Sequence, residues 1–265
     1  MYAFAYHRPT SLAALKGLLT GSAEARFLAG GQTLLPTLKQ RLASPDAVID
    51  LKGIGALASI ARTAGGLEIG ALATHAAVAA SPVVQQAIPA LAALADGIGD
   101  PQVRNRGTLG GSIANNDPAA DYPAALVALG ATVKTSERVI AAGDFFTGMF
   151  ETDLEPGEVV TAVTFSIPRR AAYVKFPNPA SRYAIVGVFV AETAPGVRVA
   201  VTGAASCVYR LAEAEHALTR SFTPGALDGL QVSPKGLNSD IHAGAFYRAH
   251  LIAVMAKRAV ERALG

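Results

Sequence analysis

Apolar residues recur every three or four positions in two segments near the start of the chain, 11–20 and 33–43. This spacing places the apolar side chains on one face of a helix, so it predicts two helices. Pro36 falls in the first turn of the second helix, where proline is tolerated. Short apolar runs at 25–30 and 47–51 predict a strand on each side of that helix. The strand, loop, helix, strand order favours a parallel pair.

The middle of the chain has a different pattern. Residues 66–74 alternate between apolar and polar positions and predict a strand, whereas 82–98 predict a helix. A loop is expected over 99–120 and a short helix over 121–131. Three antiparallel strands are then predicted, with turns at Gly143 and at Pro156–Gly157; they are 132–136, 138–146 and 158–168.

After Pro168 the pattern begins again. Three strands are predicted at 171–176, 183–193 and 197–207, and two helices at 211–219 and 242–264. The fold class expected from these elements is α+β, with a boundary near residue 168. We expect one domain over 1–168, made of a small lobe (1–52) and a larger lobe (53–168), and a second domain over 169–265.

Composition narrows the possible functions. The chain has 265 residues, of which 51% are hydrophobic and 16% charged, as in a packed globular protein. Its single cysteine, Cys207, excludes an internal disulfide and a Cys-ligated cluster, and its five histidines show no metal-ligand spacing. The formal charge of +3 is dispersed, so we expect no nucleic-acid partner. We find no transmembrane-length apolar run and no secretory signal, so we expect a cytoplasmic protein.

Two glycine pairs, Gly30–Gly31 and Gly110–Gly111, are candidate ligand-binding residues. Glycines after a strand let backbone amides approach a phosphate closely, and a following helix N-terminus adds partial positive charge. A single pair is usually a tight turn, which is our interpretation of Gly65–Gly66. Two pairs, each beside a hydroxyl side chain, predict a pyrophosphate held between two loops, and therefore a dinucleotide. Neither loop matches the Rossmann or P-loop fingerprint.

The polar residues around the second pair allow more than one interpretation. Asp121 can accept hydrogen bonds from sugar or ribityl hydroxyls, or it can cap the helix that follows it. Asp117 and Asn115–Asn116 are typical turn formers. Arg104 and Arg106 can offset phosphate charge or fix the loop by salt bridges at a subunit surface, and we favour the salt bridges because amide loops need no arginine.

Several long motifs carry a family resemblance, in this order: LAGGQTLLPTLKQRLASPDAVIDL, IGDPQVRNRGTLGGSIANNDPAADYPAALVALGA, DFFTGMFETDLEPGEVVTAV and YVKF. The chain resembles the FAD-binding medium subunit of the molybdenum hydroxylases, a group that includes the carbon monoxide dehydrogenase medium subunit and the flavin domain of xanthine dehydrogenase. The resemblance covers nearly the whole chain and is weakest in its C-terminal third.

The resemblance implies a two-part FAD-binding domain of the vanillyl-alcohol oxidase type, followed by a three-stranded sheet with helices. It also implies a set of FAD contacts in the two glycine loops and near the flavin. These are Leu28, Ala29, Gly30, Gly31, Gln32, Thr33, Leu34 and Leu35; Thr108, Leu109, Gly110, Gly111 and Ser112; and Ile98, Asp121, Val160 and Lys175. Val160 stands where the family usually has leucine, and the loops after Pro195 and around 220–240 are shorter than in most members.

The function implied is an electron-transfer subunit of a molybdenum-containing dehydrogenase. A large molybdopterin-binding subunit and a small [2Fe-2S] subunit are the expected partners, in a dimer of heterotrimers, and NAD or a quinone is the expected acceptor. We find no acid–base constellation, so no catalytic residue is expected in this chain. Two alternatives stay open: a stand-alone FAD-dependent oxidase or reductase, and a non-catalytic nucleotide-binding assembly subunit.

Overall fold

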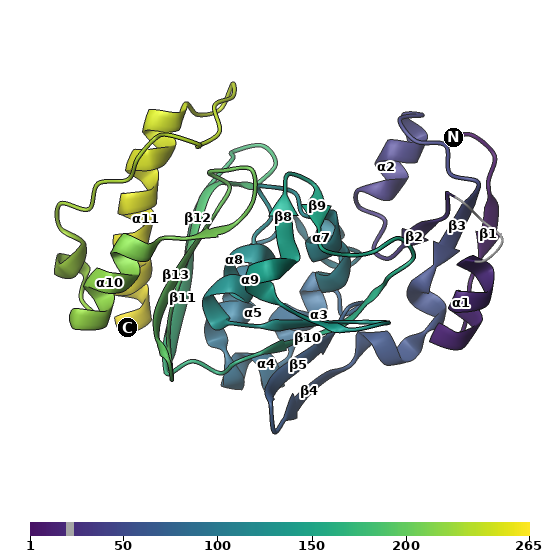
Figure 1. Ribbon diagram of the computed structural model, residues 1–265, viewed down its shortest axis with the longest axis horizontal. Helices are drawn as coiled ribbons and strands as arrows, with labels where there is room; N and C mark the ends of the chain where they lie inside the picture. Colours follow the sequence, from purple (N-terminus) through teal and green to yellow (C-terminus); the bar gives the residue numbers. More distant parts are fainter. Residues whose placement is uncertain (20–23) are drawn as a thin grey trace.

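Three main β-sheets lie side by side along the long axis of the molecule, from the N-terminal end to the C-terminal end (Figure 1). The structure is a computed structural model that describes residues 1–19 and 24–265. Helices and strands are mixed throughout, in agreement with the α+β class. No helix within the described ranges is long and apolar enough to span a membrane.

The N-terminal sheet has three parallel strands in the order β1-β3-β2. They are β1 (Ala5–His7), β2 (Arg26–Leu28) and β3 (Ala47–Asp50), and they are accompanied by α1 (Leu12–Leu19) and α2 (Leu34–Lys39). The parallel pair predicted around α2 is therefore confirmed. The sequence pattern does not predict β1, although β2, which is equally short, lies within the predicted strand 25–30. Residue 20, at the end of the first predicted helix, lies outside the described residues.

The middle sheet is antiparallel, with the order β4-β5-β10-β6-β7. Its strands are β4 (Ile60–Thr63), β5 (Gly66–Gly70), β6 (Thr132–Thr135), β7 (Val139–Ala141) and β10 (Val160–Phe165). The segment predicted as one strand at 138–146 instead contains β7, the short helix α9 (Ala142–Phe145) and the start of β8 (Phe146–Gly148), which pairs with β9 (Glu151–Thr152). Short 3-10 turns, η1 (Leu51–Gly53) and η2 (Gly55–Ala58), connect this sheet to β3.

Several helices accompany the middle sheet, and two predictions here were wrong. The helix predicted over 82–98 is two helices, α4 (Pro82–Ala87) and α5 (Pro89–Asp96), because Pro89 starts a new helix after Ile88. The loop predicted over 99–120 contains α6 (Pro101–Arg104) and α7 (Leu109–Asn115), so the second glycine pair lies inside a helix. The other helices are α3 (His75–Ala80) and α8 (Tyr122–Leu129).

The C-terminal sheet has four antiparallel strands, not three. They are β11 (Arg170–Pro177), β12 (Ala184–Thr193), β13 (Gly196–Thr202) and the unpredicted two-residue β14 (Tyr209–Arg210). One face packs on the middle core through Phe189 and Ala191, and the other packs under the C-terminal helices through Val188 and Val190. Those helices are α10 (Ala212–Arg220) and α11 (Ala245–Leu264), with the 3-10 turn η3 (Pro224–Leu227) between them.

Candidate functional site

The two glycine loops predicted from the sequence lie against each other. A Cβ atom added to Gly30 would overlap the carbonyl oxygen of Arg106 and would lie 2.7 Å from the Cα atom of Gly107. A Cβ atom added to Gly111 would lie 3.5 Å from the Cβ atom of Ala29. The approach of these two segments therefore depends on glycine at position 30, and it brings the expected site residues of both loops together.

The first loop presents unpaired backbone donors. The N–H of Leu35 is the first to close a helical bond, to the carbonyl of Gly31 at 3.2 Å. Over residues 31–34, all of which are described, no N–H donates a hydrogen bond within the chain. Gly31 adopts a left-handed φ of +78°, which glycine reaches without strain. Leu28 and Leu35 hold the loop from below by packing with Leu38 in a small apolar cluster.

The second loop is bonded differently from the first. The N–H groups of Leu109 and Gly110 donate to the carbonyls of Ala73 and Ala71, at 3.0 and 2.8 Å. Thr108 caps α7: its hydroxyl accepts from Gly111 N–H at 3.1 Å. The N–H of Ser112 donates to the Thr108 carbonyl. The second row of free amides that we expected is therefore absent at these four positions. What remains on this side is the bare surface of Gly111 and the hydroxyl of Ser112.

His75 packs against the second loop, and no motif in the sequence indicates this role. The backbone N–H of His75 donates to the Gly107 carbonyl at 3.0 Å, and the centroid of its ring lies 5.4 Å from the centroid of the Tyr122 ring. Burial, followed by the charge of Arg104, lowers the pKa of His75 to about 4, so the ring is neutral at pH 7. Its Nδ1 atom and the Tyr122 hydroxyl are both buried without a hydrogen-bond partner.

Asp121 precedes α8, but it does not cap that helix. Its backbone is helical, and its side chain makes no capping hydrogen bond. Instead, the carboxylate accepts from the Tyr173 hydroxyl at 2.5 Å and forms an ion pair with Lys175 at 3.0 Å. Burial raises the pKa of Asp121, and the Lys175 and Tyr173 contacts oppose that rise. The helix-cap interpretation is therefore wrong.

Lys175 connects Asp121 to the segment that contains Ile98, a third residue expected near the flavin. Its ammonium group also donates to the carbonyl of Gly97 at 3.0 Å, directly before Ile98, which packs on the middle core. A cavity of about 440 Å³ adjoins the cluster. It is lined by residues of α5, β11 and α11, among them Gly97, Tyr173, Lys175, Arg258 and Arg262. Ile98, Asp121 and Lys175 thus occupy one place, at the junction of the middle and C-terminal sheets.

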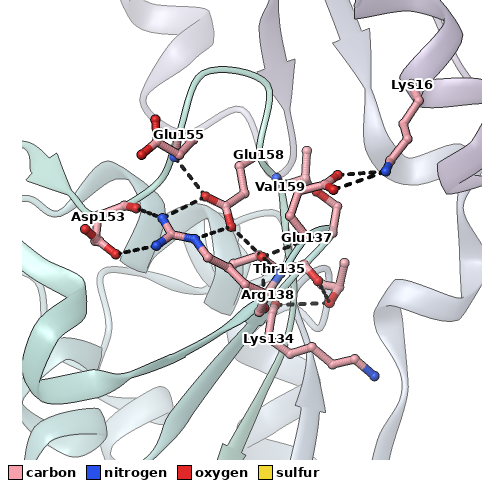
Figure 2. A network of polar contacts seen from close by, with 11 residues as sticks. Lys16, Lys134, Thr135, Glu137, Arg138, Asp153, Glu155, Glu158 and Val159 are labelled. Carbon is pink, nitrogen blue, oxygen red and sulfur yellow. Dashed lines mark hydrogen bonds and ion pairs between the residues drawn. The ribbon is translucent and has the colours of Figure 1, made fainter.

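Val160 begins β10, and a polar network fixes the chain just before it. Figure 2 shows Glu158 bonded to Arg138 and Thr135; the distances are 3.1 Å to Arg138 Nε and 2.6 Å to the Thr135 hydroxyl. Burial opposes ionisation of Glu158, but these hydrogen bonds lower its pKa below the ordinary value. Val160 itself is 4% exposed and packs in the middle core. It reaches the second loop only indirectly, because the Thr161 carbonyl accepts from Ala71 N–H.

The remaining polar residues mostly have structural roles. Arg104 forms an ion pair with Asp96 at 3.6 Å and donates to the carbonyls of Ile98 and Gly99, in agreement with the favoured salt-bridge interpretation. For Arg106 that interpretation is wrong, because this residue forms no ion pair with any described carboxylate. Asn116 ends α7 in a left-handed conformation and donates to two carbonyls of the β8–β9 hairpin. Asp117 accepts from Ala119 N–H in a turn. The turn interpretations of Asn116 and Asp117 are therefore confirmed, whereas that of Asn115 is wrong because this residue is the last of α7.

Residues 2–169 match the family model described as the FAD binding domain in molybdopterin dehydrogenase. The chain belongs to this family. It is an FAD-dependent oxidoreductase subunit, and its cofactor is FAD. The free amides of the first loop and the close approach that Gly30 permits are features of this chain that fit a dinucleotide.

The similarity to several characterised proteins extends over almost the whole chain. The nicotine 6-hydroxylase medium subunit of Paenarthrobacter nicotinovorans is 35% identical over 98% of this chain and 97% of its own length. The carbon monoxide dehydrogenase medium chain of Afipia carboxidovorans is 35% identical over 98% and 96%. Among solved structures, a Cu,Mo-CO dehydrogenase chain superposes with a TM-score of 0.91 at 34% identity, covering 99% of this chain and 98% of its own. The family resemblance seen in the sequence is confirmed.

Proposed function

We propose that this chain is the medium subunit of a molybdenum-containing dehydrogenase. In this role it passes electrons from partner [2Fe-2S] clusters to an external acceptor, NAD or a quinone. The relatives are named medium subunits or medium chains, which supports membership of a complex with a large and a small subunit. We propose that these partners bind molybdopterin and [2Fe-2S] clusters, and that the complex is a dimer of heterotrimers in the cytoplasm. FAD supplies the redox chemistry when bound, and the protein supplies its position and electrostatics.

The convergence of the two glycine loops is the observation that carries the proposal. Residues 31–34 provide free amides to a diphosphate, and Gly111 and Ser112 provide a bare surface and a hydroxyl opposite them. We assign Ile98, Asp121 and Lys175, which lie together, to the flavin end of the FAD molecule. Val160 stays a proposed contact, although its side chain is buried in the core.

We propose a division of the chain into two domains. We assign residues 1–168 to an FAD-binding domain of the vanillyl-alcohol oxidase type, with lobes 1–52 and 53–168, and residues 169–265 to a C-terminal domain. The family match over 2–169 supports the boundary. The cluster of Ile98, Asp121 and Lys175 lies across it.

The structure gives less support to a stand-alone oxidase. That function needs a free acid or base at the flavin, and both oxygens of Asp121 are engaged by Tyr173 and Lys175. Cys207, the only thiol, lies in the C-terminal part beside the Phe146 carbonyl. An assembly subunit without redox function differs from our proposal in one respect: its FAD would not be reduced by the partners.

The test is affinity purification of the tagged chain from its native host. We expect molybdenum, iron and FAD in one complex, with the flavin absorbance bleached by the substrate of the large subunit. A chain that oxidises a substrate alone would establish the stand-alone oxidase, and a complex whose FAD is never reduced would establish the assembly subunit.

A further inference from the structure

We propose that Arg8, Lys52 and Arg106 form a basic cluster that neutralises the diphosphate of FAD beside the first glycine loop. The inference deepens the proposed function and rests on it. It changes the role of Arg106, which the sequence pattern favours as a salt-bridge residue, and it adds Arg8 and Lys52, which lie outside the four sequence stretches that carry the family resemblance.

The register of the N-terminal sheet brings the first two basic residues to the loop. The three strands are parallel, so their carboxyl ends lie at one edge, where ligands of open α/β sheets bind. Leu28 pairs with Asp50 at the end of β2 and β3, so Gly30 and Lys52, each two residues further on, both follow that edge of the sheet.

Arg8 leaves the same edge from the third strand. It follows His7, which pairs with Ile49 at the end of β1. A Cβ atom added to Gly53 would lie 3.2 Å from the Arg8 Cγ atom, so Arg8 packs against the η1 turn that carries Lys52.

Arg106 arrives from the opposite side, as part of the second loop. Its carbonyl is the atom that the bare Cα of Gly30 allows to approach, so its side chain starts at the junction of the two loops. The side chain of Arg106 is exposed. Burial, then the charge of Arg106, lowers the pKa of Lys52, and Arg8 acts in the same direction. Lys52 therefore lies close enough to both arginines to be repelled by them, and the Asp50 carboxylate opposes this effect.

The carboxylates near Arg8, Lys52 and Arg106 are too few to balance the three positive charges. Asp50 is the acid at this edge; it is 7% exposed and accepts from the Tyr6 hydroxyl at 2.7 Å and from Lys52 N–H at 3.0 Å. Across residues 1–19 and 24–265, no ion pair joins Arg8, Lys52 or Arg106 to a carboxylate. Three cations and one acid leave an excess positive charge beside the unpaired amides of residues 31–34. A diphosphate supplies the missing negative charge and accepts from both sets of donors.

The experiment measures FAD affinity by quenching of FAD fluorescence, at low and at high ionic strength. It uses the flavin-stripped chain, together with its partner subunits where they co-purify. Arg106→Gln and Lys52→Gln are compared with Arg62→Gln, a matched control at an exposed position on β4, remote from the loops.

We expect each loop variant to bind FAD about tenfold more weakly than the wild type, the loss of one charge-assisted contact. The affinity of both should fall less steeply with salt, since fewer charges are screened. Arg62→Gln should match the wild type, and Arg106→Lys should recover most of the affinity. Circular dichroism identifies any variant that fails to fold, and the other charge-removing variant, Lys52→Gln or Arg106→Gln, then carries the comparison of salt dependence.

Unchanged affinity and unchanged salt dependence in both loop variants would overturn the inference while leaving the proposed function intact. A wild-type protein that binds no FAD under any of these conditions would overturn the proposed function as well.

Discussion

Asp121 and Lys175 form a buried ion pair that joins the middle of the molecule to its C-terminal sheet. Lys175 Nζ lies 3.0 Å from Asp121 Oδ1, and the two side chains are 12% and 4% exposed. Because Tyr173 also donates to Asp121, the carboxylate is a bonding centre for β11 as well as a proposed neighbour of the flavin.

Asp121→Ala should therefore destabilise the flavin-free protein. It leaves the Lys175 charge buried without its partner, for which we expect a loss of about 3 kcal/mol in the free energy of unfolding. The double variant Asp121→Ala/Lys175→Met should recover part of that loss, because it removes both charges. Urea unfolding followed by circular dichroism measures each free energy.

An exposed pair provides the control for this cycle. Asp228 and Lys257 form an ion pair at 2.6 Å, with side chains 74% and 37% exposed. Asp228→Ala should cost about 1 kcal/mol or less. If Asp121→Ala is equally mild, the Asp121–Lys175 pair is not the constraint described here.

His75 should make the stability of the chain depend on pH. Its pKa falls from 6.5 to about 4 on folding because the ring is buried, and Arg104 adds to the effect. The unfolded chain takes up a proton on this ring as pH falls below 6.5, and the folded chain does so only near pH 4. The stabilisation is therefore complete above about pH 6.5 and is lost between about pH 6.5 and 4, by roughly 3 kcal/mol in total.

The measurement is urea unfolding at a series of pH values. Between about pH 6.5 and 5, where most carboxylates stay ionised, His75→Gln should flatten the slope of stability against pH. His250→Gln, at an exposed position on α11, should keep the wild-type slope. Identical slopes in the wild type and His75→Gln would show that His75 titrates normally in the folded chain.

Gly30→Ala should separate the two loops. The new methyl group would overlap the Arg106 carbonyl and crowd the Cα atom of Gly107. Both are backbone atoms, which cannot rotate away as a side chain can. We expect weakened FAD binding, by about tenfold or more if one charge-assisted contact is lost with the geometry. Gly143→Ala, whose Cβ atom meets nothing within 4 Å, is the matched control. Equal FAD affinity in the two variants would mean that the approach of the loops is not needed for binding.

Local patterns predict much of the fold, and they fail where elements are short or interrupted. The parallel unit around α2 and the long helix α11 carry enough residues to show a period, whereas β1 and β14 have three and two residues. The second glycine pair is predicted as part of a loop because glycine disfavours helices; Thr108 nevertheless caps α7 directly before it, and packing against Ala71 leaves no room for a side chain at Gly110.

The candidate site shows the same division between local and long-range information. The glycine loops could be predicted because each is a continuous motif. The partners of Asp121, however, are more than 50 residues away in the chain, and no local pattern joins Asp121 to Tyr173. The role of Arg106 depends on the register of a sheet to which it does not belong. Such relationships arise only when the chain folds.

The most direct measurement is the visible absorption spectrum of the chain after incubation with FAD and gel filtration, for the wild type and for Gly111→Glu. The introduced carboxylate would stand three residues after the helix cap Thr108, a favoured capping arrangement, and would fill the proposed phosphate site with negative charge. The new Cβ atom would lie 2.9 Å from the Thr108 hydroxyl, which therefore has to shift, and circular dichroism checks that the variant is folded. Gly143→Glu is the control, since that position is open. We expect a flavin spectrum with the wild type and Gly143→Glu and none with Gly111→Glu. A full flavin complement in folded Gly111→Glu would contradict the assignment of the site.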